Sequence, residues 1–214
     1  MQHTHTYWQL ITNLGSSSFL LPILGIAVIE LWLSHQKRAV YLWLLALTLG
    51  VTLTLITKIL FLGWGIGIAS LNFTGVSGHT LLATSIIPIL FFAVEDNSQS
   101  KFKNFGLYFG LLLSLTIGLS RIVLGMHSIS EVVTGWLLGL VVCSVALSAI
   151  KSHRYSLAYL QFTVLILLLG SGTTTSNYIP AHDMEIKLAL FLSGHDKPYS
   201  RSDLVKIKTP VQVK

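Results

Sequence analysis

The chain has 214 residues and a mass of 23.5 kDa, which leaves room for one domain and a tail but not for a multidomain enzyme. Hydrophobic residues make up 52% of it and charged residues only 10%, with a mean hydropathy of +0.72, whereas ordinary soluble domains carry roughly 25% charged residues. This composition excludes a water-soluble globule and a disordered chain, and it indicates an integral membrane protein.

Six apolar stretches are long enough to cross a bilayer, which requires about 20 mostly apolar residues. In chain order they cover residues 18–33, 39–62, 79–94, 105–119, 131–150 and 155–170. Residues 1–17 carry no Lys or Arg, unlike the start of a signal peptide, and favour a short interfacial helix. The sequence therefore predicts an all-α integral membrane protein. Its domain would be a bundle of six transmembrane helices (18–170), with an interfacial N-terminal helix (1–17) and an extramembrane, extracytoplasmic tail (171–214).

Lysine and arginine are distributed unevenly between the connecting segments. Segments 34–38, 95–104 and 151–154 hold Lys37, Arg38, Lys101, Lys103, Lys151 and Arg154, whereas segments 63–78 and 120–130 hold only Arg121. Because short loops rich in Lys and Arg stay in the cytoplasm, we expect the segments around Ser77 and His127 to lie outside it, on the periplasmic side of a bacterial cytoplasmic membrane. The net charge of +6 is not gathered in one patch, so no nucleic-acid partner is expected.

The first polar segment at the extracytoplasmic ends of the helices is Gly75-Val76-Ser77-Gly78-His79-Thr80. Ser77 can cap the helix that follows, and the free amides of a first helical turn form an anion site. Gly78 lets an anion approach the backbone, and His79 can exchange a proton near neutral pH. Taken alone, the segment fits a phosphate site and an ordinary helix start equally well.

The second polar segment runs from Ser120 to Glu131. The planar guanidinium of Arg121 suits bidentate contact with a phosphate. His127 and Glu131 are four residues apart, so on a helix the carboxylate would hold one imidazole nitrogen and leave the other as a nucleophile. Taken alone, an arginine reaching the membrane interface and an ordinary loop histidine would explain this segment equally well.

Together the two segments resemble the signatures of the type 2 phosphatidic acid phosphatase superfamily, which includes membrane lipid phosphatases and undecaprenyl pyrophosphate phosphatases. The second signature of that family, Pro-Ser-Gly-His, is similar to residues 76–79, with Val76 in place of the proline. The third, Ser-Arg, five residues, His, three residues and Asp, is similar to residues 120–131, with Glu131 where the family has Asp.

The first signature of the family, Lys followed by six residues and Arg-Pro, is incomplete in this chain. Lys58 is present, but Gly65 and Ile66 stand where Arg-Pro belongs. Losing a preorganised donor of this kind costs about 2.7–4 kcal/mol of barrier, so we expect another cation to replace the arginine. Lys197 or Arg201 of the tail, folded back over the pocket, is the hypothesis that the sequence suggests.

The resemblance implies a role for each matching residue. His127 would attack phosphorus and form a phosphohistidine, Glu131 would orient His127, and His79 would protonate the leaving oxygen. The residues implied to hold the phosphoryl oxygens are Lys58, Ser77, Gly78, Ser120 and Arg121. The family uses no metal, so neither a metal nor another cofactor is expected.

The expected activity is that of a metal-independent phosphoric monoester or diphosphate hydrolase. Its partners would be the bilayer and a lipid phosphate or polyprenyl pyrophosphate at the outer leaflet. Two alternatives stay open at this point. One is a lipid phosphotransferase that uses the same phosphohistidine, and the other is a non-catalytic lipid-binding or lipid-transport relative, which the incomplete first signature would suit. The oligomeric state, the headgroup and the chain length of the lipid have no signal in the sequence.

Overall fold

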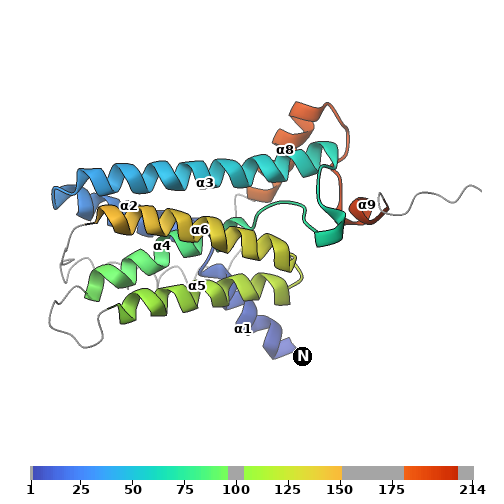
Figure 1. The fold of residues 1–214 in the computed structure, drawn as a ribbon. Helices are drawn as coiled ribbons and strands as arrows, with labels where there is room; N and C mark the ends of the chain where they lie inside the picture. Colours follow the sequence, from blue (N-terminus) through green and yellow to red (C-terminus); the bar gives the residue numbers. More distant parts are fainter. Residues whose placement is uncertain (1, 96–103, 151–180, 207–214) are drawn as a thin grey trace, which may run out of the picture.

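The structure, a computed structural model, describes residues 2–95, 104–150 and 181–206, and these residues are helical apart from their connections and one isolated bridge between Ile68 and Phe73 (Figure 1). The elements are α1 (Gln2–Asn13), α2 (Ser17–Leu33), α3 (Lys37–Trp64), the short 3₁₀ helix η1 (Ala69–Leu71), α4 (Gly78–Glu95), α5 (Phe105–Val123), α6 (Ile129–Ala149), α8 (Ala181–Ser193) and α9 (Arg201–Lys206).

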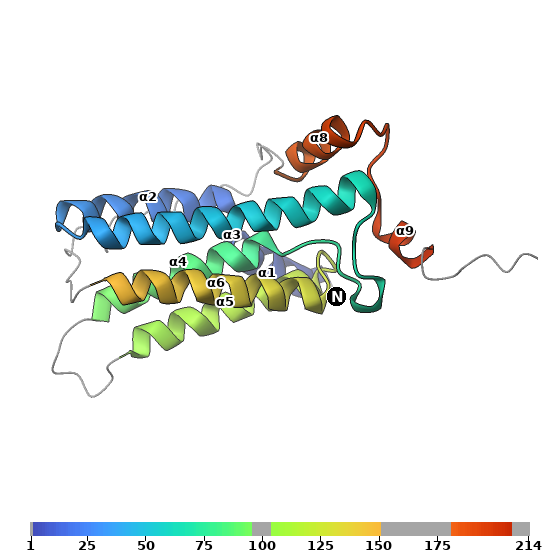
Figure 2. The same ribbon diagram turned by 45° about the horizontal axis from the view of Figure 1, so that its top comes forward.

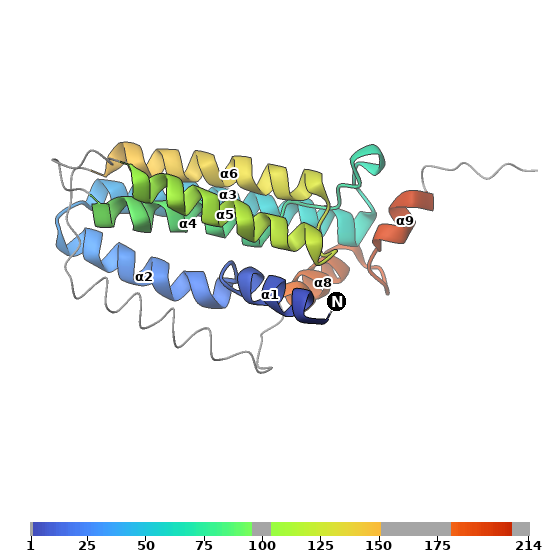
Figure 3. The same ribbon diagram turned by 90° about the horizontal axis from the view of Figure 1, so that it is seen from below.

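Helices α2 to α6 form an elongated bundle with α4 at its centre. Helix α4 packs against α5, α6, α2 and α3, and the three views show it enclosed by these neighbours (Figures 1–3). Its side chains are buried almost throughout, among them the polar Thr80, Thr84 and Ser85. The indole Nε1 of Trp43 donates to the Ser85 carbonyl at 3.1 Å, which ties α3 to α4 in the apolar core.

The outward faces of the bundle are apolar. Large exposed hydrophobic side chains follow one another along the helices, as in Leu45, Leu49 and Ile56 of α3, Leu112, Leu115 and Leu119 of α5, and Val133, Leu137 and Val141 of α6. Such stripes on several neighbouring helices suit hydrocarbon rather than water. The molecule is by composition a multi-pass membrane protein.

The prediction of six spans is confirmed only in part. By length and apolar composition, four helical stretches of the described residues could cross a membrane: Thr6–Leu33, Lys37–Trp64, Phe105–Val123 and Ile129–Ala149. The expected span 79–94 is α4, whose apolar part Gly78–Phe92 is shorter. Because neighbouring helices cover α4, packing rather than lipid surrounds it. The expected span 155–170 lies outside the described residues.

The N-terminal segment is helical as predicted, but it is integrated into the bundle. Helix α1 packs against α5, and Thr12 on it is buried. The first candidate span begins at Thr6, so the apolar stretch extends further toward the N-terminus than residue 18. Figure 3 shows α1 continuing along the bundle from α2, with Leu14-Gly15-Ser16 between them.

Glycines bring α4 close to its neighbours. A Cβ at Gly110 of α5 would lie 2.5 Å from the Pro88 Cα, and one at Gly135 of α6 would lie 2.7 Å from the Ser77 carbonyl oxygen. A Cβ at Gly139 would lie 2.6 Å from the Thr84 Cβ. These three glycines, two of them four residues apart on α6, therefore let α5 and α6 approach α4 closely.

The two ends of the bundle differ. The junction of α2 and α3, the end of α4, the start of α5 and the end of α6 lie at one end, toward the expected basic loops (Figure 1). The opposite end gathers the end of α3, the start of α4, the end of α5 and the start of α6, with α8 and α9 beside them. The residues implied to bind phosphate therefore meet at the end away from Lys37 and Arg38.

We expect Gly139→Ala to lower the free energy of unfolding by about 1–3 kcal/mol, because the added methyl group has no room beside Thr84 and overpacking a tight contact has this cost. Thermal unfolding of the purified protein in detergent, followed by tryptophan fluorescence, measures the change. The matched control is Gly25→Ala in α2, where a Cβ would meet nothing within 4 Å, so stability should be unchanged or slightly raised. Equal effects of the two substitutions would contradict the proposed close packing.

Candidate active site

A cavity of about 810 Å³ opens at the end of the bundle where α3, α4, α5 and the C-terminal helices meet. Its polar lining includes Lys58, His79, Arg121, His127, Glu185 and Arg201. Its apolar lining includes Val51, Leu55, Leu81, Leu82 and Ile186. One cavity therefore combines a charged region with an apolar wall, and the sequence-predicted residues Lys58, Gly78, His79, Arg121 and His127 all contribute to it.

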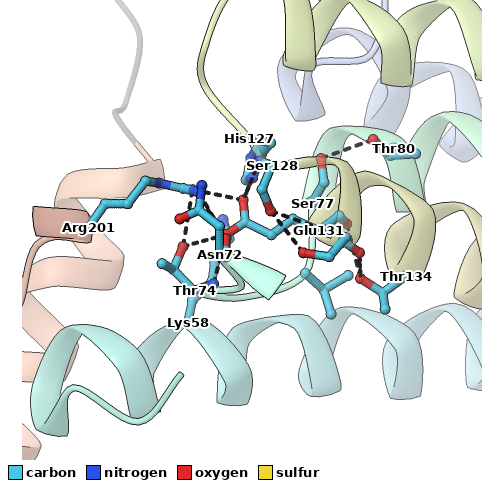
Figure 4. A network of polar contacts seen from close by, with 12 residues as sticks. Lys58, Asn72, Thr74, Ser77, Thr80, His127, Ser128, Glu131, Thr134 and Arg201 are labelled. Carbon is cyan, nitrogen blue, oxygen red and sulfur yellow. Dashed lines mark hydrogen bonds and ion pairs between the residues drawn. The ribbon is translucent and has the colours of Figure 1, made fainter. Parts of the chain in front are cut away.

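The contact at the centre of the site joins His127 to Glu131. His127 Nδ1 lies 2.7 Å from Glu131 Oε2 (Figure 4). Helix α6 begins only at Ile129, so His127 lies in the turn before the helix rather than on one of its faces. The contact depends on a capping box, in which the Ser128 hydroxyl accepts from the Glu131 amide and Glu131 Oε2 accepts from the Ser128 amide at 3.1 Å.

The Glu131 carboxylate is completely buried, with 0% of its side chain exposed, and it is surrounded by donors. Thr74 donates to Oε1 through its amide at 2.7 Å and its hydroxyl at 2.6 Å. Arg201 Nη2 lies 3.0 Å from Oε1 and 2.9 Å from Oε2. A buried carboxylate is tolerated only when it is paired and hydrogen-bonded, and these contacts satisfy both oxygens.

The loop before α4 is held in place from two sides. The Ser77 amide donates to the Glu131 carbonyl at 3.1 Å, and the Val76 amide donates to Thr57 Oγ1 of α3 at 3.1 Å. Gly75 has a φ of +148°, and a Cβ there would lie 2.8 Å from the Lys58 Cγ. Only glycine fits this close crossing, which fixes the loop carrying Thr74 against Lys58.

The surroundings of His127 favour its neutral form. Burial lowers the pKa of the ring below its ordinary value of 6.5, and the nearby cations Arg121 and Lys58 lower it further. The hydrogen bond and the charge of Glu131 raise the pKa, but by less. Because Nδ1 faces the carboxylate, the neutral ring carries its proton there. The other nitrogen, Nε2, then holds a lone pair, as a nucleophile requires.

Lys58 and Arg121 line the cavity but have protein partners. Lys58 Nζ lies 2.7 Å from Glu185 Oε1 and 3.0 Å from Oε2, so the Lys58 ammonium forms an ion pair with a carboxylate of α8. Arg121 Nη1 donates to Thr12 Oγ1 of α1 at 3.1 Å. A phosphate that is to contact Lys58 must therefore compete with Glu185.

Ser77 and Ser120, which the resemblance assigns to the phosphoryl oxygens, are fully buried and are not among the described residues that line the cavity. The Ser77 hydroxyl accepts from Thr80 Oγ1 at 2.9 Å, and the Ser120 hydroxyl donates to the Ile117 carbonyl at 2.5 Å. Both serines thus lie behind the cavity wall and have hydrogen-bond partners there.

Within the described parts of the chain, no three His, Cys, Asp or Glu side chains gather as a metal site would require. The described residues that line the cavity supply three imidazoles, three cationic side chains and the Glu185 carboxylate, and the Glu131 carboxylate contacts His127 and Arg201 from outside this lining.

Comparison with known proteins identifies the family. The profile of the PAP2 superfamily matches residues 16–155, well over half of the chain. The chain belongs to the PAP2 superfamily. An uncharacterized 22.5 kDa protein in the cps region of Klebsiella pneumoniae is 32% identical over 209 residues, 93% of this chain and 98% of that protein. Phosphatidylglycerophosphatase B of Bacillus subtilis (strain 168) is 28% identical over 136 residues, 61% of this chain and 67% of that protein. No solved structure gives a significant match.

PAP2 membership confirms the resemblance drawn from the sequence signatures. At the level of the family the chain is a lipid-phosphatase-like membrane protein, and membership implies lipid phosphate substrates in the membrane. The PAP2 match ends at residue 155, so α8 and α9 lie outside it.

Three residues that contact the site were not predicted from the sequence. Thr74, Thr12 and Glu185 contact Glu131, Arg121 and Lys58, respectively, and each comes from a segment distant in sequence from its partner. Nothing in the local sequence marks them. The capping role of Ser128 does have a signal, because Ser-x-x-Glu before an apolar run is the capping-box pattern.

We expect the His127 ring to protonate with a midpoint below pH 6.5 and to be neutral, with its proton on Nδ1, at pH 7. The reason is that burial and two cations outweigh the opposing influence of Glu131. Nuclear magnetic resonance of protein labelled with ¹⁵N-histidine measures both the tautomer and the midpoint, and His127→Asn assigns the signal. A midpoint at or above 6.5 would mean that the hydrogen bond and charge of Glu131 outweigh burial and the two cations, contrary to this prediction.

Proposed function

We propose that this PAP2 protein hydrolyses a lipid phosphate or a polyprenyl pyrophosphate at the outer leaflet through a phosphohistidine on His127. The observation that carries the proposal is the 2.7 Å contact between His127 Nδ1 and the buried carboxylate of Glu131. It fixes the ring so that Nε2 remains as the nucleophile, in a cavity that His79 and Arg121 also line.

The proposed reaction has two steps. His127 Nε2 attacks the terminal phosphorus and a P–N bond forms. The P–O bond to the leaving group, a lipid alcohol or, for a pyrophosphate, a lipid monophosphate, breaks as protonated His79 gives its proton to the leaving oxygen. The negative charges of the bound phosphate favour protonated His79, and Arg121 and Lys58 stabilise the charge on the phosphoryl oxygens. A water molecule then attacks phosphorus and gives its proton to His79. The P–N bond breaks, and inorganic phosphate leaves.

The form of the cavity supports an amphiphilic substrate. The charged groups gather toward the ends of the helices, while Val51, Leu55 and Leu81 give the same cavity an apolar wall. A phosphate group can then meet His127 while the hydrocarbon part of the lipid stays in an apolar environment. Because this end of the bundle lies away from Lys37 and Arg38, the positive-inside rule supports an extracytoplasmic site.

We expect His127→Ala to abolish phosphate release and His79→Ala to lower kcat about 10²- to 10⁴-fold, since the first removes the nucleophile and the second the general acid. The measurement is phosphate release by the purified protein from phosphatidic acid, phosphatidylglycerol phosphate, undecaprenyl pyrophosphate and lipid A. Phosphatidylglycerol phosphate is included because of the relative named phosphatidylglycerophosphatase B.

The matched control for these histidine substitutions is His35→Asn. His35 lies in the turn between α2 and α3, at the opposite end of the bundle, with a φ of 60° that asparagine tolerates, so phosphate release should be unchanged. A radiolabelled donor should leave acid-labile label on the wild type and none on His127→Ala. Normal turnover by His127→Ala would overturn the proposal, and label passed to a second lipid instead of water would make the protein a phosphotransferase.

We expect Glu185→Gln to lower KM for the lipid substrate about two- to fivefold with little change in kcat. The substitution releases Lys58 from an ion pair whose partners are 21% and 14% exposed, and such pairs contribute about 0.2–1 kcal/mol. Steady-state kinetics of the two proteins measures the effect.

Asp183→Asn is the control for Glu185→Gln, because Asp183 lies on the same helix, is exposed and does not line the cavity. It should leave KM unchanged. A higher KM for Glu185→Gln would mean that Glu185 assists binding of the lipid phosphate instead of competing with it.

A further inference from the structure

Arg201 is brought to the site by a segment that lies outside the PAP2 match. Helix α9 starts at this residue, and 36% of the Arg201 side chain is exposed. Its Nη2 contacts both oxygens of Glu131 at 3.0 and 2.9 Å and also approaches Thr74 Oγ1 at 3.3 Å, while its Nη1 donates to the Asn72 carbonyl at 3.0 Å (Figure 4).

The connection to α9 is anchored over the end of α3. The Tyr199 amide donates to the Leu62 carbonyl at 2.9 Å, and His195 Nδ1 lies 2.7 Å from the Gly63 carbonyl oxygen. Leu204 of α9 is buried in a small apolar cluster with Phe61 and Leu62. These contacts fix where α9 begins, so the approach of Arg201 to Glu131 follows from packed contacts rather than from one long side chain.

Gly65 makes room for this connection. It ends α3 with a φ of +69°, and a Cβ at this position would lie 2.9 Å from the Tyr199 ring. Any longer side chain at position 65 would displace Tyr199. The first signature of the family has its arginine at position 65. The glycine that replaces this arginine here leaves the space that Tyr199 occupies, in the segment that carries Arg201.

We propose that Arg201 is a positioning residue, which acts through Glu131 to hold His127 in the orientation needed for attack on the phosphate. The role rests on the proposed function. It differs from the hypothesis that Lys197 or Arg201 replaces a cation facing the phosphoryl group, because both terminal nitrogens of Arg201 donate to protein atoms. Lys197 is exposed and is not among the described residues lining the cavity.

The physical reason is the charge of Glu131. Of the donors to this carboxylate, Thr74 and Ser128 are neutral, and His127 is neutral when it acts as a nucleophile. Arg201 therefore supplies the full positive charge in contact with the buried anion. Without it the carboxylate would draw a proton onto His127 more strongly, and a protonated ring has no lone pair on Nε2 for attack.

The titratable and charged groups around His127 come from every helix that lines the cavity. They are Lys58 of α3, His79 of α4, Arg121 of α5, Glu131 of α6, His182 and Glu185 of α8, and Arg201 of α9, which reaches His127 through Glu131. Removing one cation from this set raises the proton affinity of the His127 ring. The acid limb of the rate profile then moves to higher pH, an effect that loss of a merely structural contact would not produce.

The experiment compares the full-length wild type with Arg201→Gln, Arg201→Lys and Arg201→Ala. We expect Arg201→Gln to lower kcat about 10- to 100-fold, the equivalent of one charge-assisted hydrogen bond, with KM within about twofold because the phosphate contacts remain. The midpoint of His127 in the histidine resonance titration should rise by about half a unit or more. Arg201→Lys retains the charge without the planar fork, so its kcat should lie between those of Arg201→Gln and the wild type.

Chemical rescue separates positioning from folding. Because Arg201 lines the cavity and is partly exposed, guanidinium added to Arg201→Ala at non-denaturing concentration should restore part of kcat, whereas sodium chloride of equal ionic strength should not. The matched control is Lys197→Gln, which removes a cation of the same segment that does not line the cavity and should leave kcat, KM and the titration unchanged.

The outcomes distinguish this role from the proposed function. A wild type that releases no phosphate from any lipid tested overturns the proposed function and the positioning role together. An active wild type whose Arg201→Gln variant keeps kcat and the His127 midpoint overturns the positioning role alone. A loss of kcat in Arg201→Gln with an unmoved midpoint and no rescue by guanidinium also overturns it, because the arginine would then only support the fold.

Discussion

A fully buried carboxylate determines the arrangement of this end of the molecule. Desolvating a charge is costly unless donors replace the lost water, and the donors to Glu131 come from the loop before α4, from the turn before α6 and from α9. These three segments are far apart in sequence, and the Glu131 carboxylate joins them at one point. The Glu131 carboxylate also fixes the His127 ring, because Nδ1 of this ring is one of the donors.

The rest of the bundle makes this polar site compatible with a membrane. Outward faces of α3, α5 and α6 are apolar. In the described parts of α2 to α6, the charged residues lie toward the ends of the helices, where the energetic cost of polarity is lowest. Close glycine contacts on α5 and α6 hold α4 in the centre. This packing places His79, at the start of α4, beside the cavity that His127 lines.

The C-terminal helices add charges of both signs to a site whose PAP2 match ends at residue 155. Glu185 of α8 contacts Lys58, and Arg201 of α9 contacts Glu131. The first ion pair engages Lys58, a cation that lines the cavity, and the second stabilises the Glu131 anion that contacts His127. A segment outside the PAP2 match can therefore influence both the binding of a phosphate and the state of the nucleophile.

Much of this protein could be predicted from its sequence, because apolar runs and charge bias act locally and need no partner. The runs gave helices α2 to α6, and the two signatures gave the family and the residues Lys58, His79, Arg121 and His127 around one cavity. The position of His127 before α6, rather than on it, could also have been predicted from the Ser128 capping box. The burial of Ser77 and Ser120, the Glu185 contact and the attachment of Arg201 to Glu131 were decided only by the tertiary structure. They depend on packing between segments that are distant in sequence, some of them more than a hundred residues apart, such as those of Lys58 and Glu185. The local sequence around a buried charge does not specify which distant residue will donate to it.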